Sequence, residues 1–184
     1  MIKSKMILNL QGYWAVGSGK GGGNEVDSRI DRDADGLPYV PGKMLKGLIR
    51  DACFRLQEAG NADYNFADKI FGESGKIFIS DAKLSPALRN ALSEESNKDA
   101  KDNLTRNIYS TAILYETGTA ENKSLRGYEV AVPMQLTADV ECDCDADTFN
   151  RIKIAAEKLI YAVGSHKTRG LGEVIISFED IKEA

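Results

Sequence analysis

The chain has 184 residues, of which 42% are hydrophobic and 28% charged, and its formal net charge is −4 at pH 7. That length fits one domain with a substantial buried core, so we expect a single domain over residues 1–184. No apolar run approaches the ~20 residues that a membrane span requires, and the N-terminal apolar stretch is too short for a signal peptide. The sequence therefore predicts a cytoplasmic protein with no membrane contact.

The three cysteines lack the spacing of a disulfide framework. Cys53 falls within a predicted helix, while Cys142 and Cys144 flank Asp143. A structural zinc site needs four ligands, and the only histidine of the chain, His166, is distant from these cysteines in the sequence. We therefore expect free thiols and no metal site built from them.

The charged residues are unevenly distributed along the chain. A free-standing nucleic-acid-binding protein is more often basic overall, which this chain is not. Acidic residues crowd into 94–102 and 139–147, whereas 43–55 and 166–169 are locally basic. Phosphate attraction acts within about a Debye length, ~10 Å, so one basic surface is sufficient. The composition permits RNA binding without establishing it.

The first half of the chain predicts a strand, a long loop and a helix. β-Forming residues alternate roughly over 3–15, and the loop over 17–37 is too long for a simple connection. The helix begins at Pro41, whose missing N–H costs nothing in the first turn, and ends at Gly60. Its apolar stripe has the spacing of one buried face and comprises Met44, Leu45, Leu48, Ile49, Ala52, Cys53 and Leu56.

The second half adds three strands and a second long helix. The predicted elements are a short strand over 76–81, a weak helix or turn over 85–95, an inserted polar segment at about 97–125, a long strand over 126–140, a helix over 148–163 and a buried strand over 173–178. The order is that of a ferredoxin-like (RRM-like) β-α-β-β-α-β domain of the α+β class, with inserted loops. Right-handed crossovers would place both helices on one face of an antiparallel sheet.

The segment Gly164 to Gly172 joins the last helix to the last strand and combines glycines with basic residues. Its backbone freedom at Gly170, together with His166, Lys167 and Arg169, suits contact with RNA phosphates and 2′-hydroxyl groups. A solvated connecting loop would have the same composition. The spacing alone leaves both interpretations open.

The long loop holds four aspartates, Asp27, Asp31, Asp33 and Asp35, beside two arginines. A calcium loop of the EF-hand type would need a glutamate at its twelfth position, where Gly42 stands. Two alternatives stay open: solvated ion pairs with the arginines, and a carboxylate that assists phosphodiester cleavage.

Two other enzyme motifs fail. The glycine-rich stretch 17–23 does not fit a phosphate-binding loop, because Gly21 follows its lysine where Ser or Thr is required. A hydrolase elbow of the Gly-x-Ser-x-Gly type is absent from the sequence. Neither nucleotide hydrolysis nor a serine nucleophile is expected.

Four sequence blocks follow one another along nearly the whole chain. They are Gly36-Leu-Pro-Tyr-Val-Pro-Gly-Lys-Met-Leu-Lys-Gly-Leu-Ile-Arg50, then Ile70-Phe71-Gly72 with Gly75-Lys-Ile-Phe-Ile-Ser-Asp81, then Glu116-Thr-Gly-Thr-Ala120 with Leu125-Arg-Gly-Tyr-Glu129, and finally Gly164 to Val174. These blocks resemble the motifs of the RAMP superfamily of CRISPR-associated proteins, with Lys43 and Met44 standing where two serines are usual.

Within the superfamily, the chain resembles the repeated backbone subunit of type III CRISPR interference complexes, which serve antiviral defence. The resemblance implies partners: CRISPR RNA, target RNA, other RAMP subunits and a large polymerase-like subunit. It also implies a β-hairpin thumb from residues 97–125. The basic face of the first helix and the glycine-rich loop would bind RNA, and the candidate RNA-binding residues are Lys43, Lys46, Arg50, His166, Lys167, Arg169 and Gly170.

The resemblance further implies an endoribonuclease that cuts target RNA. Asp27 matches the loop aspartate that catalytic members need, and Asp33 matches a following Arg-Asp pair. Mg2+ or another divalent cation would assist the cleavage. Two alternatives remain: a non-catalytic structural or capping RAMP subunit, and a general RNA-binding module outside CRISPR systems.

Overall fold

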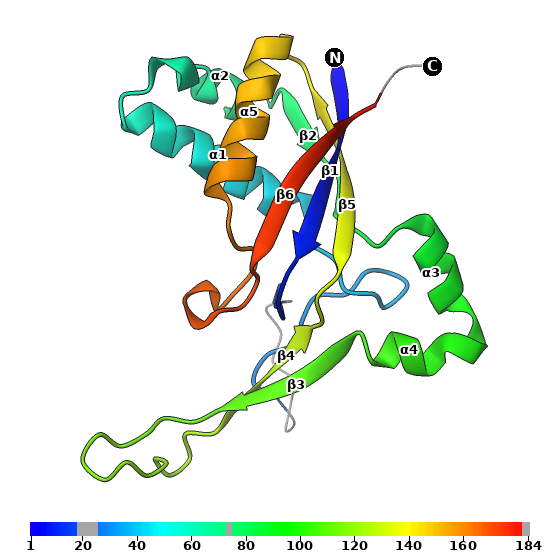
Figure 1. The fold of residues 1–184 in the computed structure, drawn as a ribbon, viewed down its shortest axis with the longest axis vertical. Helices are drawn as coiled ribbons and strands as arrows, with labels where there is room; N and C mark the ends of the chain where they lie inside the picture. The colour runs from blue at the N-terminus through cyan, green and yellow to red at the C-terminus, as the bar shows by residue number, and fades with distance from the viewer. Residues whose placement is uncertain (18–25, 73–74, 182–184) are drawn as a thin grey trace.

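The computed structural model describes residues 1–17, 26–72 and 75–181, and it contains a four-stranded and a two-stranded antiparallel sheet (Figure 1). The larger sheet has the strand order β2-β5-β1-β6. Its strands are β1 (Ile2–Leu10), β2 (Ile77–Ile79), β5 (Gln135–Cys142) and β6 (Val174–Asp180). The expected α+β class with antiparallel sheets is confirmed.

The central strand β1 shows why one face of this sheet is buried. Ser4, Met6, Leu8 and Leu10 are buried while the residues between them are exposed or half-buried, as the period of two in a strand requires. The register places Met6 opposite Ala138 of β5 and Phe178 of β6, so apolar side chains of three strands share that face.

Two helices cover the buried face, α1 (Gly42–Glu58) and α5 (Ala146–Leu159), and they lie against each other on the same side of the sheet (Figure 1). Asp145 caps α5, since its carboxylate accepts a hydrogen bond from the Thr148 N–H at 2.8 Å. The first predicted helix, from Pro41 to Gly60, matches α1 closely. The second predicted helix, 148–163, is wrong at its end, because α5 stops at Leu159, and the buried Val163 lies in the segment after it, where its N–H donates to the Gly172 carbonyl.

The buried face also contains two of the cysteines. Cys53 and Cys142 are buried, and Cys144 is half-buried. Burial raises the pKa of the Cys53 thiol to about 12 and raises that of Cys142 as well, so both thiols stay protonated at neutral pH.

The two-stranded sheet is a hairpin of β3 (Thr105–Ser110) and β4 (Arg126–Ala131) that projects from the end of the larger sheet opposite the chain termini (Figure 1). The prediction of one strand over 126–140 is therefore wrong. The chain leaves one sheet at Ala131 and enters the other at Gln135. Pro133 lies in this gap, where its missing N–H cannot continue a ladder.

Shorter helical segments fill the connections. They are η1 (Ala62–Tyr64), α2 (Ala67–Phe71), α3 (Pro86–Ser93), η2 (Glu95–Asn97), α4 (Lys98–Asp102) and η3 (Lys167–Arg169). The predicted first strand, 3–15, ends earlier, at Leu10. Most of the glycine-rich stretch 17–23 lies outside the described residues. Within the part of the chain that is described, no helix has both the length and the hydropathy to span a bilayer.

Candidate functional site

Asp27 lies along the edge of the hairpin strand β4. Its backbone N–H donates to the Gly127 carbonyl at 2.7 Å, and its Oδ2 accepts a hydrogen bond from the Gly127 N–H at 2.9 Å. One residue later, Ser28 forms a parallel bridge with Tyr128 and accepts from the Glu129 N–H at 3.0 Å. The start of the aspartate-rich loop thus runs beside β4 and fixes the Asp27 carboxylate on the hairpin.

Gly127 is the residue that permits this close approach. A Cβ added there would lie 2.8 Å from a ring carbon of Tyr109 and 3.2 Å from a methyl carbon of Val26. Both distances are below ordinary contact, so a side chain at this position would displace the Tyr109 ring or the segment that carries Asp27. Glycine therefore lets the Tyr109 ring and the Val26 side chain lie directly against the strand at this point.

Glu129 ties the next part of the loop to the hairpin. Its side chain is only 14% exposed, and its Oε1 accepts from Arg32 at 2.6 Å. Its Oε2 accepts from the Ile30 N–H at 3.1 Å. Arg32 also donates to the Gly36 carbonyl at 3.1 Å and to Thr105 Oγ1 at 3.0 Å. One half-buried glutamate and one arginine therefore join the loop, at Ile30 and Gly36, to both hairpin strands.

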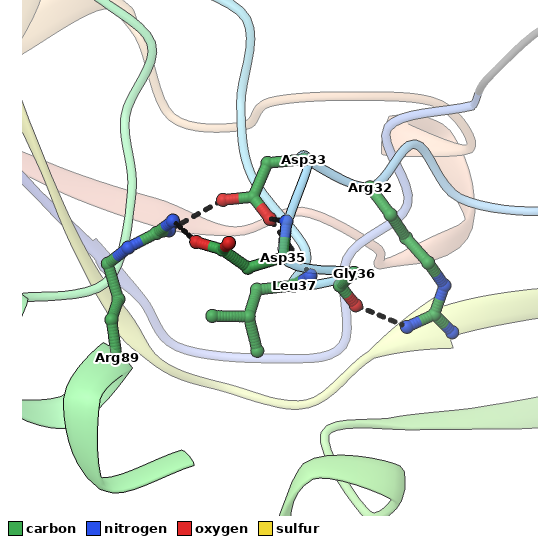
Figure 2. A network of polar contacts seen from close by, with 6 residues as sticks. All are labelled: Arg32, Asp33, Asp35, Gly36, Leu37 and Arg89. Carbon is green, nitrogen blue, oxygen red and sulfur yellow. Dashed lines mark hydrogen bonds and ion pairs between the residues drawn. The ribbon is translucent and has the colours of Figure 1, made fainter. Parts of the chain in front are cut away.

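Asp33 lies in the middle of a polar network that Figure 2 shows from close by. Its Oδ1 accepts from the N–H groups of Asp35 and Leu37, both at 3.0 Å, and its Oδ2 accepts from Arg89 of α3 at 2.5 Å. Burial raises the pKa of the Asp33 carboxyl, but Arg89 and these N–H groups lower it by more, so it falls below its ordinary value of 3.8. Both oxygens are engaged, which gives Asp33 a structural role.

The other two aspartates of the loop are also engaged. Asp31 accepts from the Tyr39 hydroxyl at 3.0 Å and from the Arg32 N–H at 3.0 Å, while Asp35 pairs with Arg89. Burial and the Asp31 carboxylate raise the pKa of Tyr39, which keeps its hydroxyl a donor. Asp27 is exposed, and among the described contacts only its Oδ2 has a partner. Asp35 also has one oxygen without a described partner, but Arg89 pairs its charge. Asp27 is therefore the aspartate of this loop that accepts only a backbone N–H among the described contacts.

The glycine-rich loop contacts the same hairpin strand, β4. His166 stacks on Tyr128 with ring centroids 4.7 Å apart and an interplanar angle of 24°. At both ends of the loop the backbone passes too close to a neighbouring carbonyl oxygen for a side chain. A Cβ added at Gly164 would lie 2.3 Å from the Ala15 carbonyl oxygen, and one added at Gly172 would lie 1.9 Å from the Val163 carbonyl oxygen. Through the consecutive residues Gly127 and Tyr128, the structure brings the Asp27 and His166 segments together.

The basic residues of α1 are placed differently from one another. Lys43 and Arg50 are exposed. The expectation that Lys46 also faces solvent is wrong, since this residue is half-buried and its ammonium group donates to the Ile77 carbonyl at 3.0 Å. Lys46 therefore joins α1 to β2, and only Lys43 and Arg50 present charge to solvent on this side of the helix.

Two surface hollows adjoin these basic groups. Lys43 lines an open groove of about 610 Å³ together with Phe78, Lys83 and Arg89. Lys167 of the glycine-rich loop lines a smaller hollow between α1 and the end of α5. Lys167 is half-buried, whereas the following Arg169 and Gly170 are exposed, and Gly170 has a φ of +79°.

The open face of the larger sheet is not a basic surface. Lys3 lies 3.6 Å from Glu141, and Lys5 stands in register between Asp139 of β5 and Glu179 of β6. The lysines on this face are thus matched by carboxylates on the neighbouring strands. Such a surface has little attraction for phosphate.

Sequence reasoning missed three residues that build the site: Arg89, Tyr128 and Glu129. The last two stand in the block Leu125-Arg-Gly-Tyr-Glu129, so a motif marked their position without giving their contacts. Arg89 carried no signal, because nothing in the sequence pairs an arginine of a weakly predicted helix with Asp33.

A comparison with models of protein families matches residues 8–175 to the RAMP superfamily. The match covers most of the chain. The protein belongs to the RAMP superfamily. No curated protein matches this RAMP protein at a significant level.

Two solved structures similar to this RAMP protein are chains of Type III-B Cmr-beta, studied by cryo-EM. The one bound to cognate target RNA is 13% identical, with 97% of each chain covered and a TM-score of 0.69. The one in the apo state is 15% identical, with 99% of this chain and 98% of that chain covered and a TM-score of 0.69. At such identities the likeness shows the fold alone.

Proposed function

We propose that this RAMP protein is an RNA-binding backbone subunit of a type III CRISPR effector complex and that Asp27 cuts target RNA held on it. CRISPR RNA and target RNA are then its ligands, and other RAMP subunits and the large polymerase-like subunit its protein partners in the cytoplasm. Membership of the superfamily supports the first part, as does a fold shared with Type III-B Cmr-beta, one structure of which is bound to cognate target RNA.

In this proposal the larger sheet with α1 and α5 is a ferredoxin-like palm. The thumb, expected from 97–125, is the β3–β4 hairpin, whose second strand lies beyond those bounds and ends at Ala131. The order β2-β5-β1-β6 with two helices on one face supports the palm. Exposed apolar side chains on the connection beyond the hairpin strands support the thumb: Ile113 is 60% exposed, Tyr115 102% and Leu125 68%. Apolar and aromatic side chains at such a tip suit insertion between stacked bases.

The RNA backbone would follow the exposed cations. Lys43 and Arg50 on α1 and Arg169 in the glycine-rich loop are free of carboxylate partners among the described residues. His166 and Gly170 would approach phosphates and 2′-hydroxyls, with Lys167 beside them. The self-neutralised open face of the sheet would stay outside the RNA path. Affinity of this kind is independent of sequence and depends on salt.

The observation that carries the cleavage proposal is the position of Asp27. Its carboxylate is held on the thumb by the Gly127 N–H and has no cationic partner among the described contacts. In contrast, Asp33 and Asp35 pair with Arg89. Asp31 accepts from the Tyr39 hydroxyl and the Arg32 N–H. A target nucleotide displaced at the thumb would lie beside it. Cleavage then needs the neighbouring 2′-oxygen in line with the phosphorus and the leaving 5′-oxygen, so the protein mainly positions the strand.

The residues present fit a divalent cation that protein and RNA hold jointly. Mg2+ is usually bound by one or two carboxylates plus phosphates, and the exposed Asp27 carboxylate beside a target phosphate would offer that ligand type. Among the described residues, no group of three or more potential ligand side chains occurs. Asp27 would supply the protein ligand. The cation would neutralise charge on the phosphate during cleavage.

Substitutions at Asp27 in the assembled complex test the proposal. Asp27→Asn keeps an acceptor for the Gly127 N–H but removes the charge, so we expect target-RNA cutting to be lost while assembly and RNA content stay normal. Asp102→Asn, on exposed α4, is the matched control and should cut like the wild type. Undiminished cutting by the Asp27→Asn variant would rule out the proposed role of Asp27 in cleavage.

A non-catalytic structural or capping subunit is the second candidate. The hydrogen bond between Asp27 and Gly127 favours it, because this structural contact alone can account for an aspartate at this position. Under this candidate Asp27→Asn cuts normally, whereas Asp27→Ala, which also loses the hydrogen bond, impairs assembly. The pair of variants separates the two functions.

A further inference from the structure

Arg89 of α3 bridges two aspartates of the loop that carries Asp27. One guanidinium nitrogen donates to Asp33 at 2.5 Å and another donates to Asp35, as Figure 2 shows. The Arg89 side chain is 20% exposed and the Asp33 side chain 4%. A planar guanidinium that meets two carboxylates in this way fixes orientation as well as charge.

Without Arg89 the buried Asp33 carboxylate would lose its counter-charge. Its remaining partners are the N–H groups of Asp35 and Leu37, which shape the turn over 33–37. A buried charge that has lost its partner is strongly unfavourable, so the turn would open to reach water. The conformation of the turn therefore depends on a residue of α3.

The turn is connected to Asp27 by a chain of polar contacts. The Gly36 carbonyl accepts from Arg32, Arg32 pairs with Glu129, and Glu129 accepts from the Ile30 N–H. Ile30 lies three residues beyond Asp27, in the segment that runs along β4. A shift of the turn would pass to this segment, because the first and last links hold backbone groups, the Gly36 carbonyl and the Ile30 N–H, and an ion pair joins them.

We propose that Arg89 is a positioning residue for Asp27: the helix α3 acts as a brace that keeps the loop carboxylate in place on the thumb. The inference rests on the proposed function for its effect on cutting. Its structural part, a coupling between Arg89 and the Asp27 segment, can be measured without any cutting.

The test compares Arg89→Ala with Arg151→Ala in the assembled complex. Arg151 is a matched control, since it also bridges two aspartates, Asp63 at 2.7 Å and Asp147 at 2.9 Å, but on α5. Displacement of a reacting group by about an ångström can cost on the order of 100-fold, so we expect Arg89→Ala to lower the single-turnover cutting rate about 10- to 100-fold. Target-RNA affinity should stay within about twofold in both variants.

Three further measurements keep the result interpretable. Arg89→Lys, which retains the charge, should recover part of the rate. Arg89→Ala should add little to the loss already caused by Asp27→Asn, because it acts through that residue. Hydrogen exchange at the Asp27 and Ile30 amides should speed up in Arg89→Ala and not in Arg151→Ala.

The outcomes distinguish the two hypotheses. If Asp27→Asn cuts normally, the proposed function fails, whatever Arg89 does. If Asp27→Asn abolishes cutting while Arg89→Ala cuts like the wild type and leaves both amides protected, the positioning role of Arg89 is overturned. Should Arg89→Ala fail to fold, Asp35→Asn removes the more exposed arm of the bridge and is expected to give a smaller change in the same direction.

Discussion

The imidazole ring of His166 stacks on the phenol ring of Tyr128, with centroids 4.7 Å apart. This contact joins the loop over 164–172 to the hairpin strand whose preceding residue, Gly127, holds Asp27. His166 is also one of two non-glycine residues with a positive φ, +57°, among those described. The ring contact therefore holds the loop at a residue whose backbone conformation most residues disfavour.

We predict that the ring and the backbone of His166 can be separated by two substitutions. His166→Ala loses the stack and keeps the strain that His166 already has at this φ, so the free energy of unfolding should fall by about 0.5–1.5 kcal/mol. His166→Gly also loses the stack, but relief of that strain, about 1–2 kcal/mol, offsets the loss, so it should be the more stable of the two. Urea unfolding measures both. Equal stabilities for the wild type and the two variants would contradict the prediction.

A second prediction concerns Lys46. Because its ammonium group donates to the Ile77 carbonyl and is half-buried, Lys46→Met should lower the free energy of unfolding by about 1.5–3 kcal/mol, the range for hydrogen bonds to charged groups. Arg50→Met, at an exposed position of the same helix, should leave stability nearly unchanged and reduce retention of RNA instead. If Lys46→Met loses RNA while remaining as stable as the wild type, Lys46 belongs to the RNA surface after all.

The helix α1 could be predicted from sequence because its signals are local. Pro41 marks its start, and the apolar stripe through Leu45 and Ile49 has one period throughout. The hairpin was harder to predict, because the sequences of β4 and β5 form one alternating pattern and only Pro133 marks the break between the two sheets.

The candidate site depends on contacts between distant parts of the chain. Asp27 and Gly127 are separated by 100 positions, and Arg89 and Asp33 by 56. The sequence marked Asp27 through a resemblance, but it could not say which of the four aspartates bind a side chain elsewhere in the fold. That distinction needs the hydrogen bonds of Asp31, Asp33 and Asp35, none of which has a sequence pattern.

A third prediction follows from the lowered pKa of Asp33. A carboxyl whose pKa is lower in the folded than in the unfolded chain stabilises the fold above the unfolded value of 3.8, and that contribution disappears as the pH falls through the folded pKa. The stability difference between the wild type and Asp33→Asn should therefore be constant near neutral pH and shrink below about pH 4. Urea unfolding at a series of pH values measures it.

Arg89→Met provides the control for that experiment. With the guanidinium removed, burial opposes ionisation of Asp33 more effectively, so acid destabilisation should begin at a higher pH than in the wild type. An Arg89→Met variant with the wild-type pH dependence would show that the pKa of Asp33 is lowered by its backbone donors alone.

The fourth prediction separates the two faces on which lysines occur. Lys43 and Arg50 face solvent without carboxylate partners in the described structure, whereas Lys3 and Lys5 stand beside Glu141, Asp139 and Glu179. Each lost phosphate contact reduces the slope of log affinity against log salt by about 0.7–0.9. We expect Lys43→Gln and Arg50→Gln each to reduce this slope for RNA binding, measured between low and moderate salt.

The double variant Lys3→Gln, Lys5→Gln is the control. It should keep the wild-type slope, because those lysines already have carboxylate partners. If the double variant lowers the slope as far as the α1 variants do, the RNA path crosses the open face of the sheet.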